Sequence, residues 1–157
     1  MNLRTQVPLF IKLADFREVS HSIEFMTKHH IDGLVGVNTQ KNYAQFSIHQ
    51  KDNKLFETYT RMYGGGISGR PIRRFACDQI RNDCKEIQRQ SSHLKLIHVG
   101  GISTYAAMQE SRCNESVILR EWYTGMMHAL ATNPFEKVYK SMVEGNNGNN
   151  PGNICKS

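Results

Sequence analysis

The stretch that decides the fold is Leu94–Thr104, LKLIHVGGIST. It begins with an apolar run of the length of a strand and continues with the pair Gly100–Gly101. Ser103 then provides a side chain that commonly caps the first turn of a helix. A strand that ends in glycines and passes directly into a helix is the repeating unit of parallel α/β folds. We therefore expect a β/α unit here, with its helix beginning after Ser103.

Similar apolar runs lie on both sides of this stretch. One spans Val7–Ala14, another begins at Ile31, and a less regular one, interrupted by Arg120 and Glu121, begins at Ser116. The run Val7–Ala14 is nearly continuous, as expected of a buried strand in a parallel sheet. Together the four runs predict four strand-helix units, a parallel sheet and an α/β fold.

Segments with helical character separate the expected strands. Apolar residues recur at helical spacing in 15–30 and 73–90, and a further helix is expected after Ser103. The last helix is expected to begin with Asn133 as its cap and Pro134 in its first turn.

Two segments do not fit this alternation. Residues 41–62 are polar and weakly periodic, so we expect a long loop there, of the kind that forms lids or binding loops. Residues 145–157 are rich in Asn and Gly, and we expect them to be disordered. The remainder, 1–144, is expected to form one domain.

Composition limits the kinds of partner. The chain of 157 residues has 20 Lys and Arg against 14 Asp and Glu, a formal net charge of +6, which favours an anionic partner such as phosphate, carboxylate, nucleic acid or a membrane surface. No apolar window is long enough for a transmembrane helix, and no secretory signal is recognisable. The cysteines follow no metal-ligand spacing, so we expect no metal site. They are Cys77, Cys84, Cys113 and Cys155.

Residues suited to ligand binding follow the expected strands. Asn38 and Thr39 come after the second strand, Gly100–Gly101 after the third, and Tyr123–Thr124 after the fourth. Because the carboxyl ends of parallel strands meet at one edge, these residues are expected to lie together. Gly100–Gly101 exposes backbone N–H groups that could hold a phosphate jointly with Tyr123–Thr124, although a tight turn is an alternative explanation. Asn38 and Thr39 suit a small planar polar substrate, or only a turn.

Lys12 is unusual because it lies in the middle of an apolar strand. Burial of an ammonium group is costly unless an anion receives it, so we favour an electrostatic role toward the ligand. The alternative is a lysine whose charged end reaches solvent at a strand edge.

The blocks PLFIKLA, DGLVGVNTQ, GGGISGRPIRRFACDQIR, LIHVGGIST and WYTGMM together carry a family resemblance. In order and approximate spacing, from Pro8 to Val143, they resemble the C-terminal half of FMN-dependent dihydroorotate dehydrogenases, more the quinone-linked class 2 than class 1. The resemblance implies about four β/α units, the C-terminal half of a TIM (β/α)8 barrel.

The same resemblance assigns roles to individual residues. It implies that Lys12 lies near the flavin N1/O2 edge. It implies a substrate site for the orotate ring at Asn38 and Thr39. The implied FMN-binding residues are Lys12, Val37, Ser68, Gly69, Gly100, Gly101, Tyr123 and Thr124. It makes Gly64–Phe75 a loop beside the flavin rather than the phosphate cradle that its glycines suggest.

The resemblance also implies an activity. Such enzymes oxidise dihydroorotate to orotate through FMN in pyrimidine biosynthesis, and class 2 members pass the electrons to a membrane quinone. The first four strands, the catalytic base and the membrane-anchoring segment of the family have no counterpart here. We therefore expect no catalytic base in this chain, no activity of the chain alone, and membrane association only through that absent region.

This sequence departs from the family pattern at three positions. Val37 stands where many class 2 members have a threonine, Trp122 stands where an aliphatic residue is usual, and Arg120 is unexpected in its strand. The first of these removes one hydroxyl contact to FMN.

Two other functions stay open at this point. The half-barrel could associate with itself or with a partner chain and bind FMN without catalysis. Alternatively, a basic face could bind nucleic acid through Arg70, Arg73, Arg74 and Arg81. The arginines lack interleaved aromatic residues for base stacking, so we expect no nucleic-acid partner.

Overall fold

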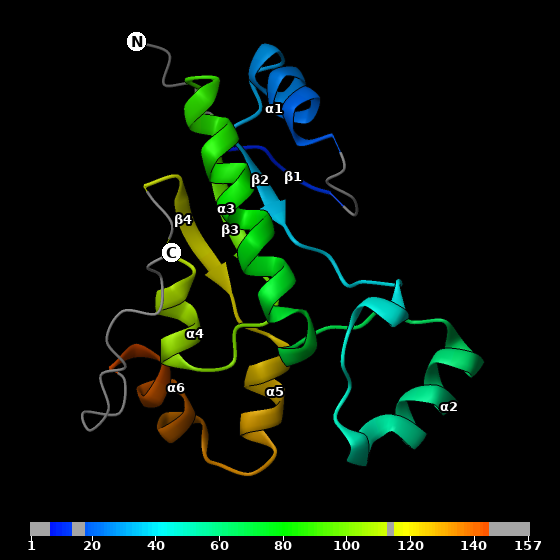
Figure 1. Ribbon diagram of the computed structural model, residues 1–157. Helices are drawn as coiled ribbons and strands as arrows, with labels where there is room; N and C mark the ends of the chain where they lie inside the picture. Colours follow the sequence, from blue (N-terminus) through cyan, green and yellow to red (C-terminus); the bar gives the residue numbers. More distant parts are fainter. Residues whose placement is uncertain (1–6, 14–17, 113–114, 145–157) are drawn as a thin grey trace.

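The computed structural model describes residues 7–13, 18–112 and 115–144. Its sheet is parallel and has the strand order β1-β2-β3-β4 (Figure 1). The strands are β1 (Phe10–Lys12), β2 (Gly33–Gly36), β3 (Lys95–Val99) and β4 (Val117–Glu121). The expected parallel α/β sheet is thus confirmed, and its carboxyl ends lie at a single edge.

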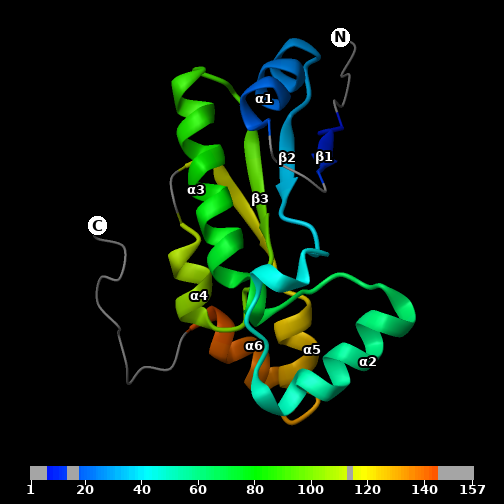
Figure 2. The ribbon, with the colours of Figure 1, turned by 45° about the vertical axis from the view of Figure 1, so that its right-hand side comes forward.

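Helices connect these strands. The α-helices are α1 (Val19–Lys28), α2 (Asn53–Tyr63), α3 (Arg73–Arg89), α4 (Tyr105–Glu110), α5 (Thr124–Leu130) and α6 (Phe135–Val143). Short 3-10 turns are η1 (Tyr43–Gln45), η2 (Gln50–Asp52) and η3 (Arg70–Ile72). In Figure 2, α1 and α3 stand side by side in front of the sheet, while α5 and α6 lie beyond the ends toward which the strands point.

The core lies between the sheet and the helices α1 and α3. One row of sheet residues is in register across all four strands, namely Ile11, Leu34, Leu96 and Val117. It belongs to the cluster that also contains Ile23 and Met26 of α1 and Ala76, Ile80, Cys84 and Ile87 of α3. Gln90 ties the two helices together, because its Nε2 donates to the Ser20 carbonyl at 2.9 Å. Burial of this apolar surface fixes the sheet against its helices.

The alternate row of the sheet is more exposed. Lys12, Val35, Ile97 and Leu119 are in register on the strands. Lys12 is exposed, and Leu119 retains 56% of its accessible surface. Val7 and Leu9, just before β1, are also exposed. The prediction that Val7–Ala14 is a buried strand is therefore wrong for the described residues, because β1 is an edge strand with one neighbour.

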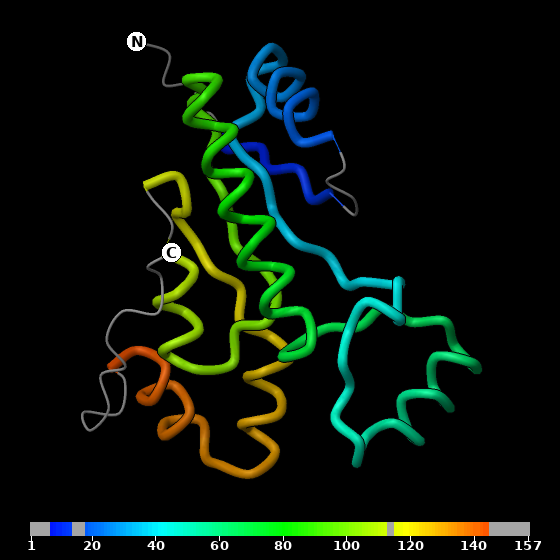
Figure 3. Tube along the Cα trace, in the orientation of Figure 1, coloured from blue at the N-terminus to red at the C-terminus, as the bar shows by residue number. Residues whose placement is uncertain are grey.

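The prediction of a long loop at 41–62 is also partly wrong. The segment forms η1, η2 and most of α2, and Figure 3 shows it leaving the sheet after β2 and returning to α3. Phe56 packs against the core cluster, and its ring meets Tyr43 edge-on at a centroid distance of 5.6 Å. A ring anchored in this way stabilises a helix that is polar elsewhere.

Two helix starts differ from expectation. Thr104, not Ser103, caps α4, and its Oγ1 accepts from the Ala107 N–H at 3.1 Å. Asn133 does not cap α6, because its Nδ2 donates back to the Ala129 carbonyl at 3.2 Å and Pro134 holds the cap position. Both differences are shifts of one residue between neighbouring candidates.

Several sequence-based predictions lie outside the described residues. These are the disorder of 145–157 and the environments of Cys113 and Cys155. Within 7–13, 18–112 and 115–144, no helix combines the length and apolar character needed to cross a lipid bilayer. In the same ranges no group of three or more His, Cys, Asp or Glu side chains could hold a metal ion.

Candidate functional site

Loops from distant parts of the chain converge at the carboxyl edge of the sheet. After β2, the Val37 N–H donates to the Val99 carbonyl at 2.8 Å, and Gln40 pairs with Ile67 in an antiparallel bridge. After β4, Thr124 Oγ1 donates to Ser68 Oγ at 3.1 Å. The loop that contains Ser68 thus reaches the start of α5, and the chain after β2 is tied to the end of β3.

Gly100 and Gly101 turn the chain directly over the start of α3. Both have positive φ, 113° and 73°, a backbone conformation that glycine adopts without strain. A Cβ at Gly100 would stand 3.1 Å from Ile72 Cδ1 and from Val37 Cγ2, and one at Gly101 would overlap the backbone of Arg73. The loop therefore keeps bare backbone beside the sheet edge, as a phosphate-binding turn requires.

Further glycines allow the loops at the carboxyl edge to approach one another closely. Gly69, with φ 72°, faces Thr124, whose Cγ2 would be 3.0 Å from an added Cβ. Gly66 lies against the Thr39 side chain in the same manner. An added Cβ at Gly125 would be 2.6 Å from the Ile102 carbonyl oxygen. The structure thus brings Ser68 and Gly69 to the start of α5, as the sequence-based grouping requires.

Asn38 and Thr39 form a turn at the end of β2. Asn38 Oδ1 accepts from the Thr39 N–H at 2.9 Å, and Gln40 Nε2 donates to the Asn38 carbonyl at 2.8 Å. Asn38 is partly buried and Thr39 is exposed. Their role toward a substrate stays a prediction, beside the turn that they make.

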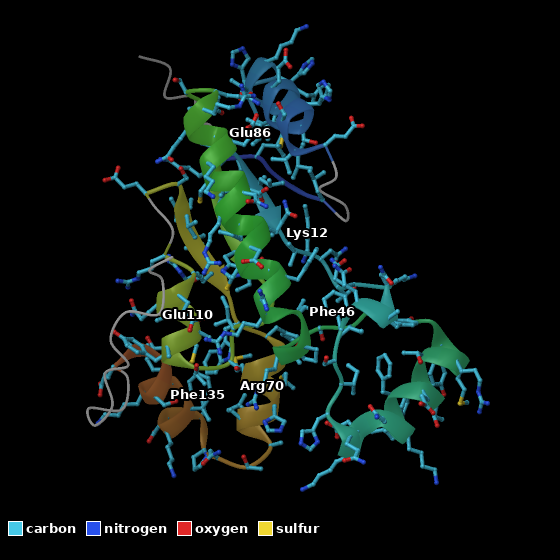
Figure 4. The ribbon with its side chains drawn as sticks, viewed as in Figure 1. Lys12, Phe46, Arg70, Glu86, Glu110 and Phe135 are labelled. Atoms are coloured by element: carbon cyan, nitrogen blue, oxygen red, sulfur yellow. The ribbon has the colours of Figure 1, made fainter. Side chains whose placement is uncertain are left out.

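Lys12 and Tyr123 are both exposed. Figure 4 shows Lys12 at the carboxyl end of β1. Its ammonium therefore carries none of the burial cost on which the sequence argument relied, because the strand lies at the sheet edge. Its role toward a flavin stays a prediction from the resemblance.

His98 on β3 and Asp83 on α3 are ionisable groups that are buried in the described chain. Burial, together with the positive charge of Arg120, lowers the pKa of His98 to about 4, and a hydrogen bond with the Gly100 backbone opposes part of this shift. On α3, burial raises the pKa of Asp83 to about 7, against a hydrogen bond from Gln79 at 2.8 Å. His98 is therefore a neutral strand residue at neutral pH. The unexpected Arg120 donates from Nε to buried Ser111 at 2.8 Å.

The arginines at the start of α3 are partly neutralised. Arg73 pairs with Glu110 at 2.5 Å, and Arg81 pairs with Asp78 at 2.8 Å. Arg74 also approaches Asp78, at 3.9 Å. Arg70 is exposed, and Figure 4 shows it beside α5. Positive charge thus surrounds the glycine loops without forming one uniform patch.

A pocket of about 480 Å³ adjoins the site on the side of α2. Its lining includes Leu55, Phe56, Tyr59, Tyr63 and the backbone of Gly65–Ser68. Sequence reasoning missed it. The spacing of four residues between Leu55, Tyr59 and Tyr63 was the signal that could have identified this helix face.

The loops after β3 and β4 are the place where a phosphate-bearing cofactor is expected to bind. A Cβ at Gly101 would overlap the Arg73 backbone, so this glycine lets the loop after β3 pack closely on the start of α3, and Trp122 Nε1 is buried without a hydrogen-bond partner among the described residues. Both lie at loops that follow β3 and β4. The backbone N–H groups of glycine turns, with the exposed Thr124 hydroxyl beside them, are donors of the kind that a phosphate group accepts.

Parallel β/α units with glycine loops gathered at the carboxyl edge define an α/β protein of the β/α-barrel type. The family model for dihydroorotate dehydrogenase matches residues 1–140. The chain belongs to the dihydroorotate dehydrogenase family.

Curated relatives agree with this assignment. The dihydroorotate dehydrogenase (quinone) of Aliivibrio salmonicida is 30% identical over 107 residues, which cover 66% of this chain and 28% of that protein. The corresponding protein of Acaryochloris marina is 29% identical over 126 residues, 77% of this chain and 31% of that protein. The resemblance to the quinone-linked class is thereby confirmed.

Solved structures support the fold. Ligand-free DHODH from Eimeria tenella has a TM-score of 0.64 at 22% identity, covering 88% of this chain and 36% of that chain. The complex of that protein with ferulenol has a TM-score of 0.59 at 22% identity, covering 78% and 30%. The predicted part of a TIM barrel is confirmed, and the chain spans about a third of the length of the proteins that it matches.

Proposed function

We propose that this chain holds the phosphate end of FMN as part of a dihydroorotate dehydrogenase site. The observation that carries the proposal is the bare backbone of Gly100 and Gly101 beside the start of α3, because only a residue without Cβ fits at Gly101. Their N–H groups, with those of Tyr123 and Thr124, would bind phosphate oxygens. The argument rests on these loops and not on helix dipoles, since α4 and α5 are short.

The remaining residues would surround the flavin ring. Ser68 and Gly69 would contact it from the loop that is joined to Thr124, and Val37 would form an apolar wall beside Gly100. The Lys12 ammonium would stabilise negative charge at the N1/O2 edge. FMN, when bound, would supply the hydride acceptor. The chain itself would hold the cofactor and exclude water around it.

Substrate and electron acceptor belong to the same proposal. Asn38 and Thr39 would hydrogen-bond the orotate ring, and dihydroorotate would be oxidised to orotate in pyrimidine biosynthesis, with a quinone as acceptor. The catalytic base and the membrane contact would come from residues outside this chain. We therefore propose that the chain alone binds the cofactor without turnover.

The test is a comparison of FMN with riboflavin, which lacks the phosphate. Flavin fluorescence titrations with purified chain are expected to show FMN binding at least about tenfold tighter than riboflavin. Equal affinities would contradict the proposed phosphate site. Addition of dihydroorotate to the FMN complex is expected to leave the visible flavin bands unchanged, and bleaching would disprove the assignment of the base to another part of the enzyme.

A second candidate function is assembly with another copy or another chain. It is favoured by apolar exposure on both edge strands or beside them, with Leu9 at 54%, Ile118 at 44% and Leu119 at 56% exposed. Analytical ultracentrifugation over a range of concentrations tests it. A concentration-independent monomer would argue against self-association.

A further inference from the structure

The pocket beside α2 is not used by the proposed function, apart from Ser68 in its lining. Its volume of about 480 Å³ lies within the usual range of small-molecule sites. One wall comes from residues 48–63 and the other from the returning loop 65–71. The pocket therefore has the size of a ligand site of its own, and the chemistry of its lining decides which ligand it fits.

Two tyrosine rings lie open on the α2 side of this pocket. Tyr59 and Tyr63 are one helical turn apart, with ring centroids 5.7 Å apart and ring planes tilted by 30°. Tyr59 retains 56% and Tyr63 69% of its accessible surface. The face of an aromatic ring attracts a cation, and quaternary ammonium ligands are recognised in this way. The two rings thus favour a positively charged ligand.

The charge of the lining has the complementary sign. Asp52 is the one charged residue among the described residues that line the pocket. Its carboxylate makes no capping hydrogen bond at the start of α2 and no ion pair with the described residues. Lys51 and Lys54 adjoin it in the sequence but do not line the pocket. A cation would therefore meet an attractive charge here, whereas an anion would be repelled.

The rest of the lining is mainly apolar and includes Ile48, Leu55, Ile67 and Pro71. Leu55 is 63% exposed, so a ligand that covers it gains from the burial of apolar surface. A bare metal ion is a poor match, because it needs several ligands and no group of three or more His, Cys, Asp or Glu in the described ranges could hold one. The ligand class that fits is therefore an organic cation with an apolar body.

We propose that this pocket binds a small organic ammonium compound. Asp52 and Tyr59 are seven residues apart, so two helical turns place them on one face with about 10 Å between their backbones. The ammonium group lies between the Asp52 carboxylate and the Tyr59 ring, and the apolar body lies against Leu55 and Ile67. The inference is independent of the proposed function, because it needs no residue of the loops after β3 and β4.

The first experiment compares three probes of similar shape on the wild-type chain labelled with ¹⁵N. Benzyltrimethylammonium is the cation, benzyl alcohol the neutral probe and phenylacetate the anion. Amide shifts in two-dimensional NMR spectra are expected to saturate with the cation and to be confined to residues 48–71. The cation is expected to bind about tenfold tighter than benzyl alcohol, and phenylacetate weakest. Equal affinities for the three probes, or shifts elsewhere in the chain, would overturn the inference.

The second experiment removes the two recognition groups one at a time. Asp52→Asn and Tyr59→Leu are each expected to weaken binding of the cation about threefold and to leave benzyl alcohol nearly unchanged. Tyr59→Phe keeps the ring face and is expected to retain most of the affinity. Glu57→Gln, an exposed position of α2 that does not line the pocket, is the matched control. Far-UV circular dichroism establishes that each variant is folded. Losses in Glu57→Gln equal to those in Asp52→Asn would contradict a role for the Asp52 charge.

A third measurement distinguishes the pocket from the flavin site. The cation is titrated again in the presence of saturating FMN, and its binding is expected to persist. Displacement by FMN would show that the probe occupies the flavin site and would overturn the inference. If FMN does not bind the chain at all, the proposed function fails, while the selectivity for the cation and the variants at Asp52 and Tyr59 still decide the role of the pocket.

Discussion

The connection after β3 and the connection after β2 reach the same edge of the sheet in different ways. The first is short, and Gly100 and Gly101 press it against Val37, Ile72 and Arg73. The second carries η1, η2 and α2 away from the sheet and returns at Ile67, where it pairs with Gln40. The short connection leaves no room for added side-chain atoms, whereas the long one packs on the core through side chains such as Phe46, Ile48 and Phe56. A tightly packed turn after β3 and a pocket beside α2 follow from that difference.

The largest effect on FMN binding and stability is expected when a side chain is added to the short connection after β3. Gly101→Val would overlap the Arg73 backbone at a positive φ, so we expect loss of FMN binding and a decrease in the free energy of unfolding of about 3 kcal/mol or more. Urea unfolding and FMN titration measure both effects. Gly65→Ala in the long connection is the matched control, because no atom lies within 4 Å of its added Cβ. Unchanged FMN affinity in Gly101→Val would show that the phosphate is held elsewhere.

A second pair of variants compares the core of the sheet with α2 in the long connection after β2. Leu96 is fully buried in the middle of the sheet, whereas Tyr59 on α2 is 56% exposed. We expect Leu96→Ala to lower the free energy of unfolding by about 3–5 kcal/mol. Tyr59→Ala is expected to change it by less than about 0.5 kcal/mol. Similar losses in urea unfolding would mean that α2 belongs to the same cooperative unit as the sheet.

A pH series tests the burial of Asp83 on α3. Asp83 has a folded-state pKa of about 7 against an ordinary value of 3.8, so the folded state keeps a proton that the unfolded state releases. Between those values the free energy of unfolding therefore falls as the pH rises, and the loss between pH 5 and pH 8 is expected to be about 3 kcal/mol. Asp83→Asn should remove this fall. His98, whose pKa is lowered to about 4, acts in the opposite direction in both proteins below pH 6.5.

Urea unfolding at several pH values measures the difference between wild type and Asp83→Asn, in which the His98 contribution cancels. Asp78→Asn, on the exposed side of α3, is the control and is expected to alter the pH profile little. A difference between wild type and Asp83→Asn that does not grow with pH would contradict the shifted pKa of Asp83.

The smallest effect concerns the hydrogen bond between the long connection after β2 and the loop after β4. Thr124→Val removes the hydroxyl that donates to Ser68 and is expected to weaken FMN binding a few-fold, by about 1 kcal/mol. Ser68→Ala and the double variant complete a cycle in which FMN affinity is measured. We expect a coupling energy of about 0.5–1 kcal/mol. Additive losses would show that the two loops contribute independently.

Much of the fold could be predicted because its signals are local. The apolar runs at β2 and β3 and the glycines that follow them specify β/α units within a few residues. The sequence blocks that resemble the dihydroorotate dehydrogenase family identified the fold as part of a barrel, which hydrophobic periodicity alone does not show. Helix caps were predicted only to within a residue, because Ser103 and Thr104 are both good caps and tertiary packing chooses between them.

The features that could not be predicted depend on what packs against a residue. The exposure of Lys12 follows from the position of β1 at the sheet edge, which the strand's own sequence does not encode. Asp83 is buried between the apolar residues Ile80 and Ile87 of one helix, although its residue type suggested the solvated face. The unpartnered Trp122 nitrogen became visible only when its surroundings were known. The flavin and substrate roles of individual residues stay predictions.

The strand order of the sheet has a consequence for assembly. Each strand pairs only with strands adjacent to it along the chain, so the sheet can grow one β/α unit at a time as the polypeptide leaves the ribosome. The hydrogen bonds already made need not be broken when the next unit arrives. β1 and β4 are then the two edges of the described sheet, and further parallel units can be added to either without rearranging what has folded.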